Sequence, residues 1–164
     1  MNQSTTQIEA DVEQLEKEIK PGSTNFLQQF DLAQKLIQLG QADRAFQVLD
    51  GVLANPQATL PMVMSVADAY NKLNQPQKLQ AALERLTHLA PDSAEAWYDL
   101  AASHATLNQN AEALKALKTA LDLNTKHLAQ NPKSTDLRST LTNDPRFAAV
   151  RQTAEYKALA PAPH

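Results

Sequence analysis

The chain has 164 residues and a formal net charge of −3, and its contents of 43% apolar and 20% charged residues are typical of a folded globular protein. It contains no cysteine, which excludes disulfides, thiolate metal sites and cysteine nucleophiles. No apolar run approaches the roughly 20 residues of a membrane span, and the first residues have neither the basic nor the apolar region of a signal peptide. We therefore expect no direct membrane insertion and a cytoplasmic location.

An amphipathic helix is predicted near the N-terminus, over residues 7–20. Its apolar positions step by four, three and four residues along one face, and the opposite face is rich in Glu and Lys. A stripe this narrow is typical of a coiled-coil seam, and two heptads are too few to be stable alone in water. The stripe must therefore pack on the rest of this chain or on a second copy, so its members are candidate oligomerisation residues. They are Ile8, Val12, Leu15 and Ile19.

Six apolar stripes at helical spacing follow, separated by short polar turns that contain Gly, Asn or Pro. They predict three helical hairpins, over residues 26–59, 60–93 and 94–125. Four sets of positions recur with a fixed period of about 34 residues, which is the signature of a repeat architecture. Their alanines let crossing helices approach closely, and their larger side chains fill the space beside them. The sets are Leu32-Ala33, Val66-Ala67 and Leu100-Ala101; Ala45, Leu79 and Ala113; Leu49, Leu83 and Leu117; and Val52, Leu86 and Ala120.

Capping side chains are expected where each hairpin begins, since Ser, Thr and Asp can accept a hydrogen bond from a free backbone N–H of the first turn. The candidates are Ser23 or Thr24 for the first hairpin, Thr59 for the second and Asp92 for the third.

The C-terminal section is predicted to cover the apolar end of the last hairpin, as a terminal cap must. No proline follows Asn124, so the returning helix is expected to continue to about Gln130. A short helix is then expected from residues 134–135 through Leu141, and a further helix from residues 143–145 onward. The domain organisation is thus an N-terminal tail and amphipathic helix over 1–25, repeats over 26–125, and a helix extension, capping helices and tail over 126–164.

The repeated pattern resembles that of the tetratricopeptide repeat family, from Phe26 to about Thr125. The resemblance implies an all-α fold, a right-handed α-solenoid of three helical hairpins with a concave groove, flanked by the N-terminal helix and the C-terminal capping helices. Bacterial repeat proteins also often end in a segment similar to residues 141–147, which supports the capping role. The third hairpin carries the resemblance best, at Trp97, Leu100, Ala101, Ala113 and Ala120.

No catalytic or metal-binding pattern stands out, and we expect neither enzymatic activity nor a cofactor or metal. No two histidines lie four residues apart, and the three glycines do not form a phosphate-binding loop. His104 lies on a packing face, which is typical of a core histidine rather than a ligand. The basic residues near the C-terminus are dispersed and lack interleaved aromatic residues, so nucleic-acid binding is not expected.

The resemblance also implies that the first helix of each hairpin lines the groove. The wall is then largely apolar, with amides and one acid for orientation, which suits a protein or peptide partner with apolar anchors. The family's chaperone-binding members hold a terminal carboxylate with several Lys, Asn and Arg residues, and that set is incomplete here. An alternative is that several of these side chains pack within the chain. The candidate groove residues are Leu27, Phe30, Gln34, Ile37, Met64, Asp68, Asn71, Lys72 and Tyr98.

Two functions remain open at this point. One is a non-catalytic scaffold that binds a partner peptide or helix in the groove. The other is a self-assembling structural module, a homo-oligomer held together through the helix at residues 7–20.

Overall fold

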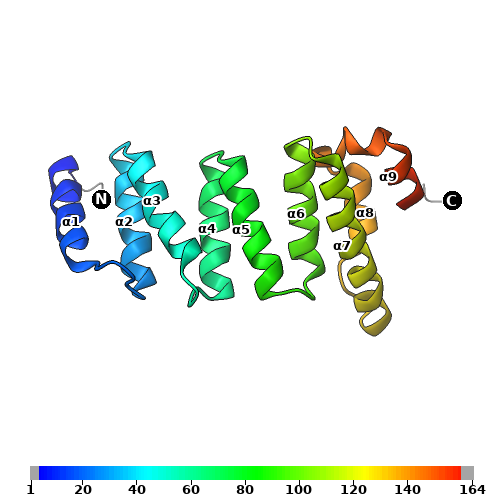
Figure 1. The fold of residues 1–164 in the computed structure, drawn as a ribbon, viewed down its shortest axis with the longest axis horizontal. Coiled ribbons are helices and arrows are strands. Elements are labelled where there is room, and N and C mark those ends of the chain that lie inside the picture. The colour runs from blue at the N-terminus through cyan, green and yellow to red at the C-terminus, as the bar shows by residue number, and fades with distance from the viewer. Residues whose placement is uncertain (1–3, 160–164) are drawn as a thin grey trace. The chain divides into compact units, whose positions relative to one another are not determined.

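The computed structural model describes residues 4–159, and every regular element among them is helical (Figure 1). The prediction of an all-α protein is therefore confirmed. The helices belong to two compact units whose boundary falls between Val66 and Ala67, inside α4 (Leu60–Lys72). The predicted C-terminal tail at residues 160–164 lies outside the described residues, as do the first three residues of the predicted N-terminal tail.

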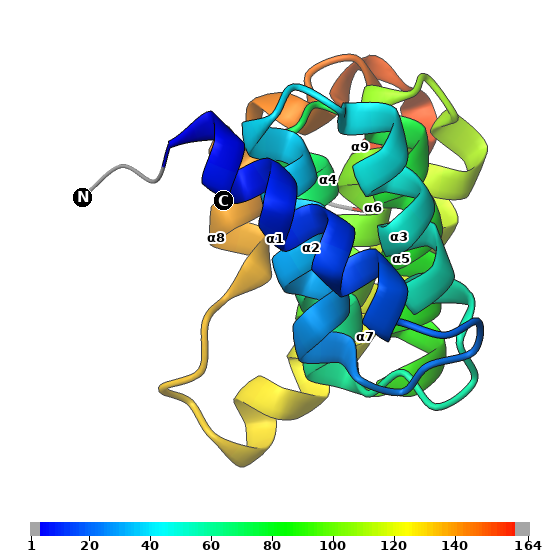
Figure 2. The same ribbon diagram turned by 90° about the vertical axis from the view of Figure 1, so that its left-hand side faces the viewer.

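The first unit contains α1 (Thr5–Glu18), α2 (Phe26–Gln38), α3 (Ala42–Ala54) and the first half of α4. α2 and α3 form an antiparallel hairpin, and α1 packs on α2 (Figure 2). The hairpin closes because each helix turns one apolar face toward the other and leaves its polar residues in water. The side chains buried in this unit include Val12, Phe26, Leu32, Ala33, Leu36, Ala45, Leu49 and Val52.

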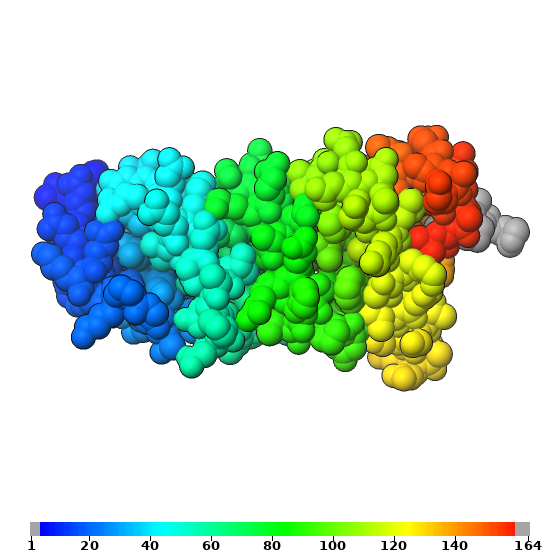
Figure 3. Space-filling view, viewed as in Figure 1, coloured from blue at the N-terminus to red at the C-terminus, as the bar shows by residue number. Residues whose placement is uncertain are grey.

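The second unit is built around the α6–α7 hairpin, and α5 packs on α6. The C-terminal end of α7 projects beyond the neighbouring helices of this unit (Figure 3). Four short elements then turn back and contact α6 and α7. The elements after α4 are α5 (Pro76–Leu89), α6 (Ala94–Thr106), α7 (Asn110–Gln130), α8 (Leu137–Asn143), the 3-10 turns η1 (Pro145–Phe147) and η2 (Val150–Gln152), and α9 (Ala154–Leu159).

The repeat period of the sequence is present in the backbone as well. α2, α4 and α6 begin at residues 26, 60 and 94, and the helices that follow them begin at 42, 76 and 110. The turn after each of α2, α4 and α6 contains one residue with positive φ, namely Gly40 (72°), Asn74 (52°) and Asn108 (59°). In each turn the next backbone N–H donates to the carbonyl five residues earlier, at 2.8, 2.9 and 2.9 Å. This is the Schellman arrangement, which satisfies the carbonyls left free where a helix ends.

Two predicted N-caps are wrong by one or two positions. Asn25, rather than Ser23 or Thr24, caps α2, and Ser93, rather than Asp92, caps α6. In both cases the side-chain oxygen accepts a hydrogen bond from the backbone N–H three residues on. Several residues of the types that cap helices precede each of these two helices. The position of the first helical turn therefore determines which of them serves as the cap.

The C-terminal section follows the prediction at its start and departs from it at its end. α7 continues to Gln130, as the missing proline after Asn124 predicted. A short helix follows, but it begins at Leu137 and is capped by Asp136. The last predicted helix is instead broken into η1, η2 and α9.

Candidate functional site

Two residues of the predicted groove stand out in the first unit because they expose large apolar side chains. Leu27, in the first turn of α2, is 83% exposed, and Met64, on the first half of α4, is 55% exposed. A scattered exposed Leu is ordinary in a soluble protein, but both of these stand at positions that the family resemblance predicts for the inner wall. They are the parts of the predicted site that are open to a partner.

The other predicted groove residues of the first unit are less open. Phe30 and Ile37 are half-buried on α2, so packing within the chain takes up part of their surface. Gln34 lies exposed on the same helix and can offer both a donor and an acceptor to a bound backbone.

The second half of α4 carries the polar part of the predicted site. The Nζ of Lys72 lies 2.6 Å from the Oδ2 of Asp68, and both side chains are exposed. Exposed ion pairs of this kind contribute little to stability. Asn71, also exposed, stands beside it in the sequence.

Tyr98 was expected on the open wall, and the structure corrects this. Its side chain is only 4% exposed, and its hydroxyl donates a hydrogen bond of 2.9 Å to the Oδ2 of Asp144. Its ring also packs against Phe147, with a distance of 5.4 Å between ring centroids. The C-terminal section therefore covers Tyr98, and this residue is closed to a partner in this state.

The contact between Tyr98 and the C-terminal section is also electrostatic. Burial is the largest single influence and opposes ionisation of Asp144, but the hydrogen bonds from Arg146 and Tyr98 and the charge of Arg146 together outweigh it and hold the pKa of Asp144 below its ordinary value. The Arg146 guanidinium lies 2.7 Å from Asp144, 3.3 Å from Asp99, and over the Tyr98 ring at 5.7 Å. Burial and the nearby Asp144 carboxylate raise the pKa of Tyr98, so its hydroxyl keeps the proton that it donates.

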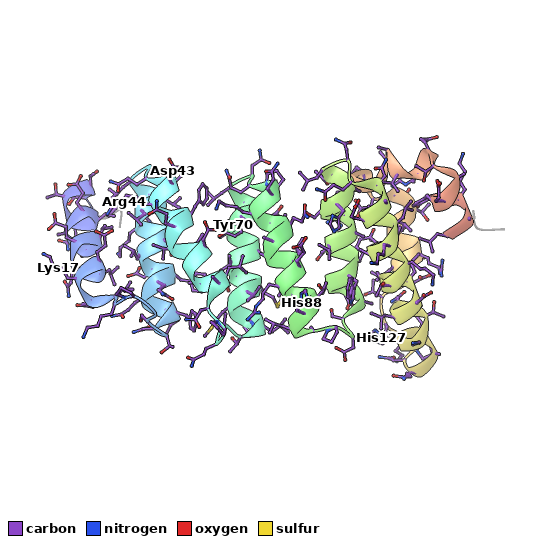
Figure 4. All side chains as sticks on the ribbon, in the orientation of Figure 1. Lys17, Asp43, Arg44, Tyr70, His88 and His127 are labelled. Atoms are coloured by element: carbon purple, nitrogen blue, oxygen red, sulfur yellow. The ribbon has the colours of Figure 1, made fainter. Side chains whose placement is uncertain are left out.

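The predicted oligomerisation stripe lies on α1, where the chain itself covers much of it. Val12 is buried, and Ile8, Leu15 and Ile19 are half-buried. Two ion pairs tie α1 to the next helices: Asp11 to Lys35 at 3.0 Å, and Glu16 to Arg44. Lys17, by contrast, points away from α2 (Figure 4).

The described part of the chain holds no metal-binding cluster, and its described histidines lie on separate helices. No group of three or more His, Asp or Glu side chains within residues 4–159 could hold a metal ion. His88 and His127 lie on different helices (Figure 4). His104 is buried, and its Nδ1 lies 2.6 Å from the Oε1 of Gln109, as expected for a core histidine with a hydrogen-bond partner.

An open depression of about 440 Å³ lies where α3 ends in the first unit. Its walls carry no charged or titratable side chain, so it provides only backbone groups and uncharged side chains to a ligand. Its lining residues are Gly22, Thr24, Gly51, Ala54, Asn55, Pro56 and Gln57. None of the helices within residues 4–159 is long and apolar enough to cross a membrane.

Comparison with known families identifies the hairpin of α6 and α7. Residues 94–127 match a family model described as "Tetratricopeptide repeat". The match begins at the first residue of α6 and ends within α7. The search of curated proteins finds no match to this chain.

Proposed function

Since the chain is a tetratricopeptide repeat protein, we propose that it is a non-catalytic scaffold that binds a protein or peptide partner through the inner face of its first helices. One observation carries the proposal. Leu27 and Met64 hold large apolar side chains in water at inner-face positions, at 83% and 55% exposure. Exposed apolar side chains at such positions indicate a surface that another molecule covers.

The extent of the repeats is part of this proposal. We assign them to residues 26–59, 60–93 and 94–125, because the helix bounds and the positive-φ turns recur at the same interval in all three. The right-handed course of the solenoid stays a prediction from the family resemblance.

The chemistry of the wall indicates the kind of partner. Leu27 and Met64 offer contact to apolar anchors, and Met adapts to anchors of different shape because its side chain is flexible. Gln34 offers a donor and an acceptor to a backbone and adds no charge. A helix or extended segment with apolar anchors and little net charge therefore fits best.

The proposal is tested by affinity capture with a variant that keeps the fold. Leu27→Ser combined with Met64→Ser removes both open anchors, and since both side chains are largely exposed we expect less than about 0.5 kcal/mol of change in unfolding free energy. Partners captured by the wild type should be lost from the double variant.

Leu89→Ser is the matched control. Leu89 is also an exposed large apolar residue, but it lies on α5, the second helix of its hairpin. This variant should retain the same partners. Equal capture by the double variant and the wild type would contradict the proposal.

A further inference from the structure

The C-terminal section has a second role beyond closing the end of the last repeat. We call residues 136–159 the strap. Its α8, η2 and α9 contact α7, as a terminal cap does, but η1 contacts α6, the first helix of the last hairpin. The strap therefore covers part of the helix face that the family resemblance predicts for partner binding.

Comparison of equivalent positions in two repeats shows that the strap covers α6. Met64 and Tyr98 occupy the same position in successive repeats, because each is the fifth residue of its helix, α4 or α6. Met64 is 55% exposed and Tyr98 is 4% exposed. Phe147 and Asp144 of the strap supply the contacts to Tyr98, so the strap does at this position what a bound partner would do at Met64.

Three contacts of different kinds hold the strap on α6. The Phe147 ring, with no exposed surface, packs against the Tyr98 ring. The Asp144 carboxylate accepts the hydrogen bond of the Tyr98 hydroxyl at 2.9 Å. The Arg146 guanidinium lies over the same ring and pairs with Asp99 at 3.3 Å. One turn of α6 thus contacts three groups of the strap together: a carboxylate, a guanidinium two residues later and an aromatic ring three residues later.

The strap is held by these contacts rather than by its own regular structure. Its elements have seven, three, three and six residues, each too short to be a stable helix alone. Arg151 donates hydrogen bonds to the carbonyls of Leu141 and Asp144, which ties its parts to one another. A segment with these properties can open as a unit while the α6–α7 hairpin stays folded.

We propose that the strap is a built-in ligand of the inner face of α6, and that it opens to let this face bind a partner segment with a carboxylate three residues before an aromatic residue. This deepens the proposed function, on which it rests for the existence of a partner. The strap's own turn, Asp144 to Phe147, is the template for that segment.

Hydrogen exchange of the intact protein tests the opening. The backbone N–H groups of Phe147 and Ala148 donate within the strap, so their exchange reports its opening. We expect them to exchange at least about tenfold faster than the amides in the middle of α6 and α7. Tyr98→Phe removes the hydrogen bond to Asp144 and should accelerate strap exchange by a further factor of about ten, while α6 is unaffected. Equal exchange rates in the strap and in α6, in both proteins, would show that the strap is an inseparable part of the hairpin and would overturn the proposal.

A peptide tests recognition separately. The probe is a fluorescent peptide of residues 141–152, LTNDPRFAAVRQ, and its binding is followed by anisotropy. Phe147→Ala in the protein weakens the strap, so the probe should bind this variant at least about tenfold more tightly than the wild type. Should Phe147→Ala lose helical content, Arg146→Ala takes its place, because the Arg146 side chain is 44% exposed and its removal leaves the apolar anchor in position.

The control peptide carries Asp144→Asn and Phe147→Ala and should not bind. Absence of binding by the unaltered probe, or equal binding to wild type and variant, overturns the proposal. This experiment needs no natural partner, so its result is independent of capture by the Leu27 and Met64 variants, which tests the proposed function.

Discussion

Asn124 accepts a hydrogen bond of 3.0 Å from the backbone N–H of Leu137, the first residue of α8. Its side-chain amide donates a second hydrogen bond, of 2.7 Å, to the carbonyl of Thr135. Asn124 is only 3% exposed, and its bond with the Leu137 N–H forms away from water, where an unpaired backbone group is costly. One side chain of α7 thereby fixes the place at which the strap begins.

Asn124→Ala should therefore destabilise the protein by about 1–3 kcal/mol, because it leaves the buried backbone N–H of Leu137 without a partner. The measurement is urea unfolding followed by circular dichroism. Asn143→Ala is the control, since Asn143 is exposed at the end of α8, and it should change the unfolding free energy by less than about 0.5 kcal/mol. Similar values for the two variants would show that the hydrogen bonds of Asn124 contribute little.

The hairpins of α2 with α3 and of α6 with α7 could be predicted from the sequence because their determinants are local and repeated. An Ala at a helix crossing lets the neighbouring helix approach closely, and a larger apolar residue beside it fills the remaining space. Such pairs recur in all three predicted repeats. The turns also follow from residue type, since Gly40, Asn74 and Asn108 are among the few residues that adopt positive φ at low cost.

The state of Tyr98 could not be predicted in the same way. Its cover comes from Asp144, forty-six residues further along the chain. Periodicity shows that a helix face is apolar, but it does not show which distant segment covers that face. The signal that could have helped is the short Asp144–Phe147 turn, whose residues offer a carboxylate and a ring to a tyrosine. This turn is a single 3-10 element, η1, with its cap, and it is too short to give a helical period from which its docking could be inferred.

The Asp144 carboxylate should make stability depend on acidic pH. Burial opposes its ionisation, but the hydrogen bonds from Arg146 and Tyr98 and the charge of Arg146 together outweigh burial, so the pKa of Asp144 in the folded chain lies below 3.8. A carboxyl group with a lowered pKa stabilises the fold above its unfolded value, and this contribution is lost as the pH falls through the folded value. Burial raises the pKa of Asp99, so the contribution of Asp99 to the pH dependence has the opposite sign.

Asp144→Asn should lower the unfolding free energy at about pH 7 and reduce its decline between about pH 5 and about pH 2, because the ionised form is no longer available. Urea unfolding at several pH values measures both effects. Asp122→Asn is the control for the loss of an exposed carboxylate: Asp122 pairs with Lys118 on the surface, and its loss should change the unfolding free energy at about pH 7 by less than about 0.5 kcal/mol. An Asp144 variant with the full wild-type decline would contradict this role.

Two exposed glycines of the first unit should respond to alanine in opposite directions. Gly51 lies inside α3 and Gly40 has a φ of +72°, and a Cβ at either position would meet no atom within 4 Å. The difference between them therefore comes from the backbone alone. Gly51→Ala should raise the unfolding free energy by about 0.5–1 kcal/mol, because alanine loses less backbone entropy in a helix. Gly40→Ala should lower it by about 1 kcal/mol through strain in the left-handed region. Thermal unfolding of the two variants measures both, and a shift of the same sign in both would contradict this explanation.

The apolar stripe on α1 provides a test between the two candidate functions, a binding scaffold and a self-assembling module. Val12 is buried against the chain's own helices, and Asp11 and Lys35 hold α1 in place on α2. A second copy could use the stripe only by displacing this packing. We therefore expect a monomer by light scattering, both for the wild type and for Val12→Ala, which should lose about 1–2 kcal/mol of stability through its two missing methyl groups. A wild-type dimer that becomes monomeric in Val12→Ala, or after removal of residues 1–22, would favour self-assembly, since only an intermolecular seam would depend on that side chain for association.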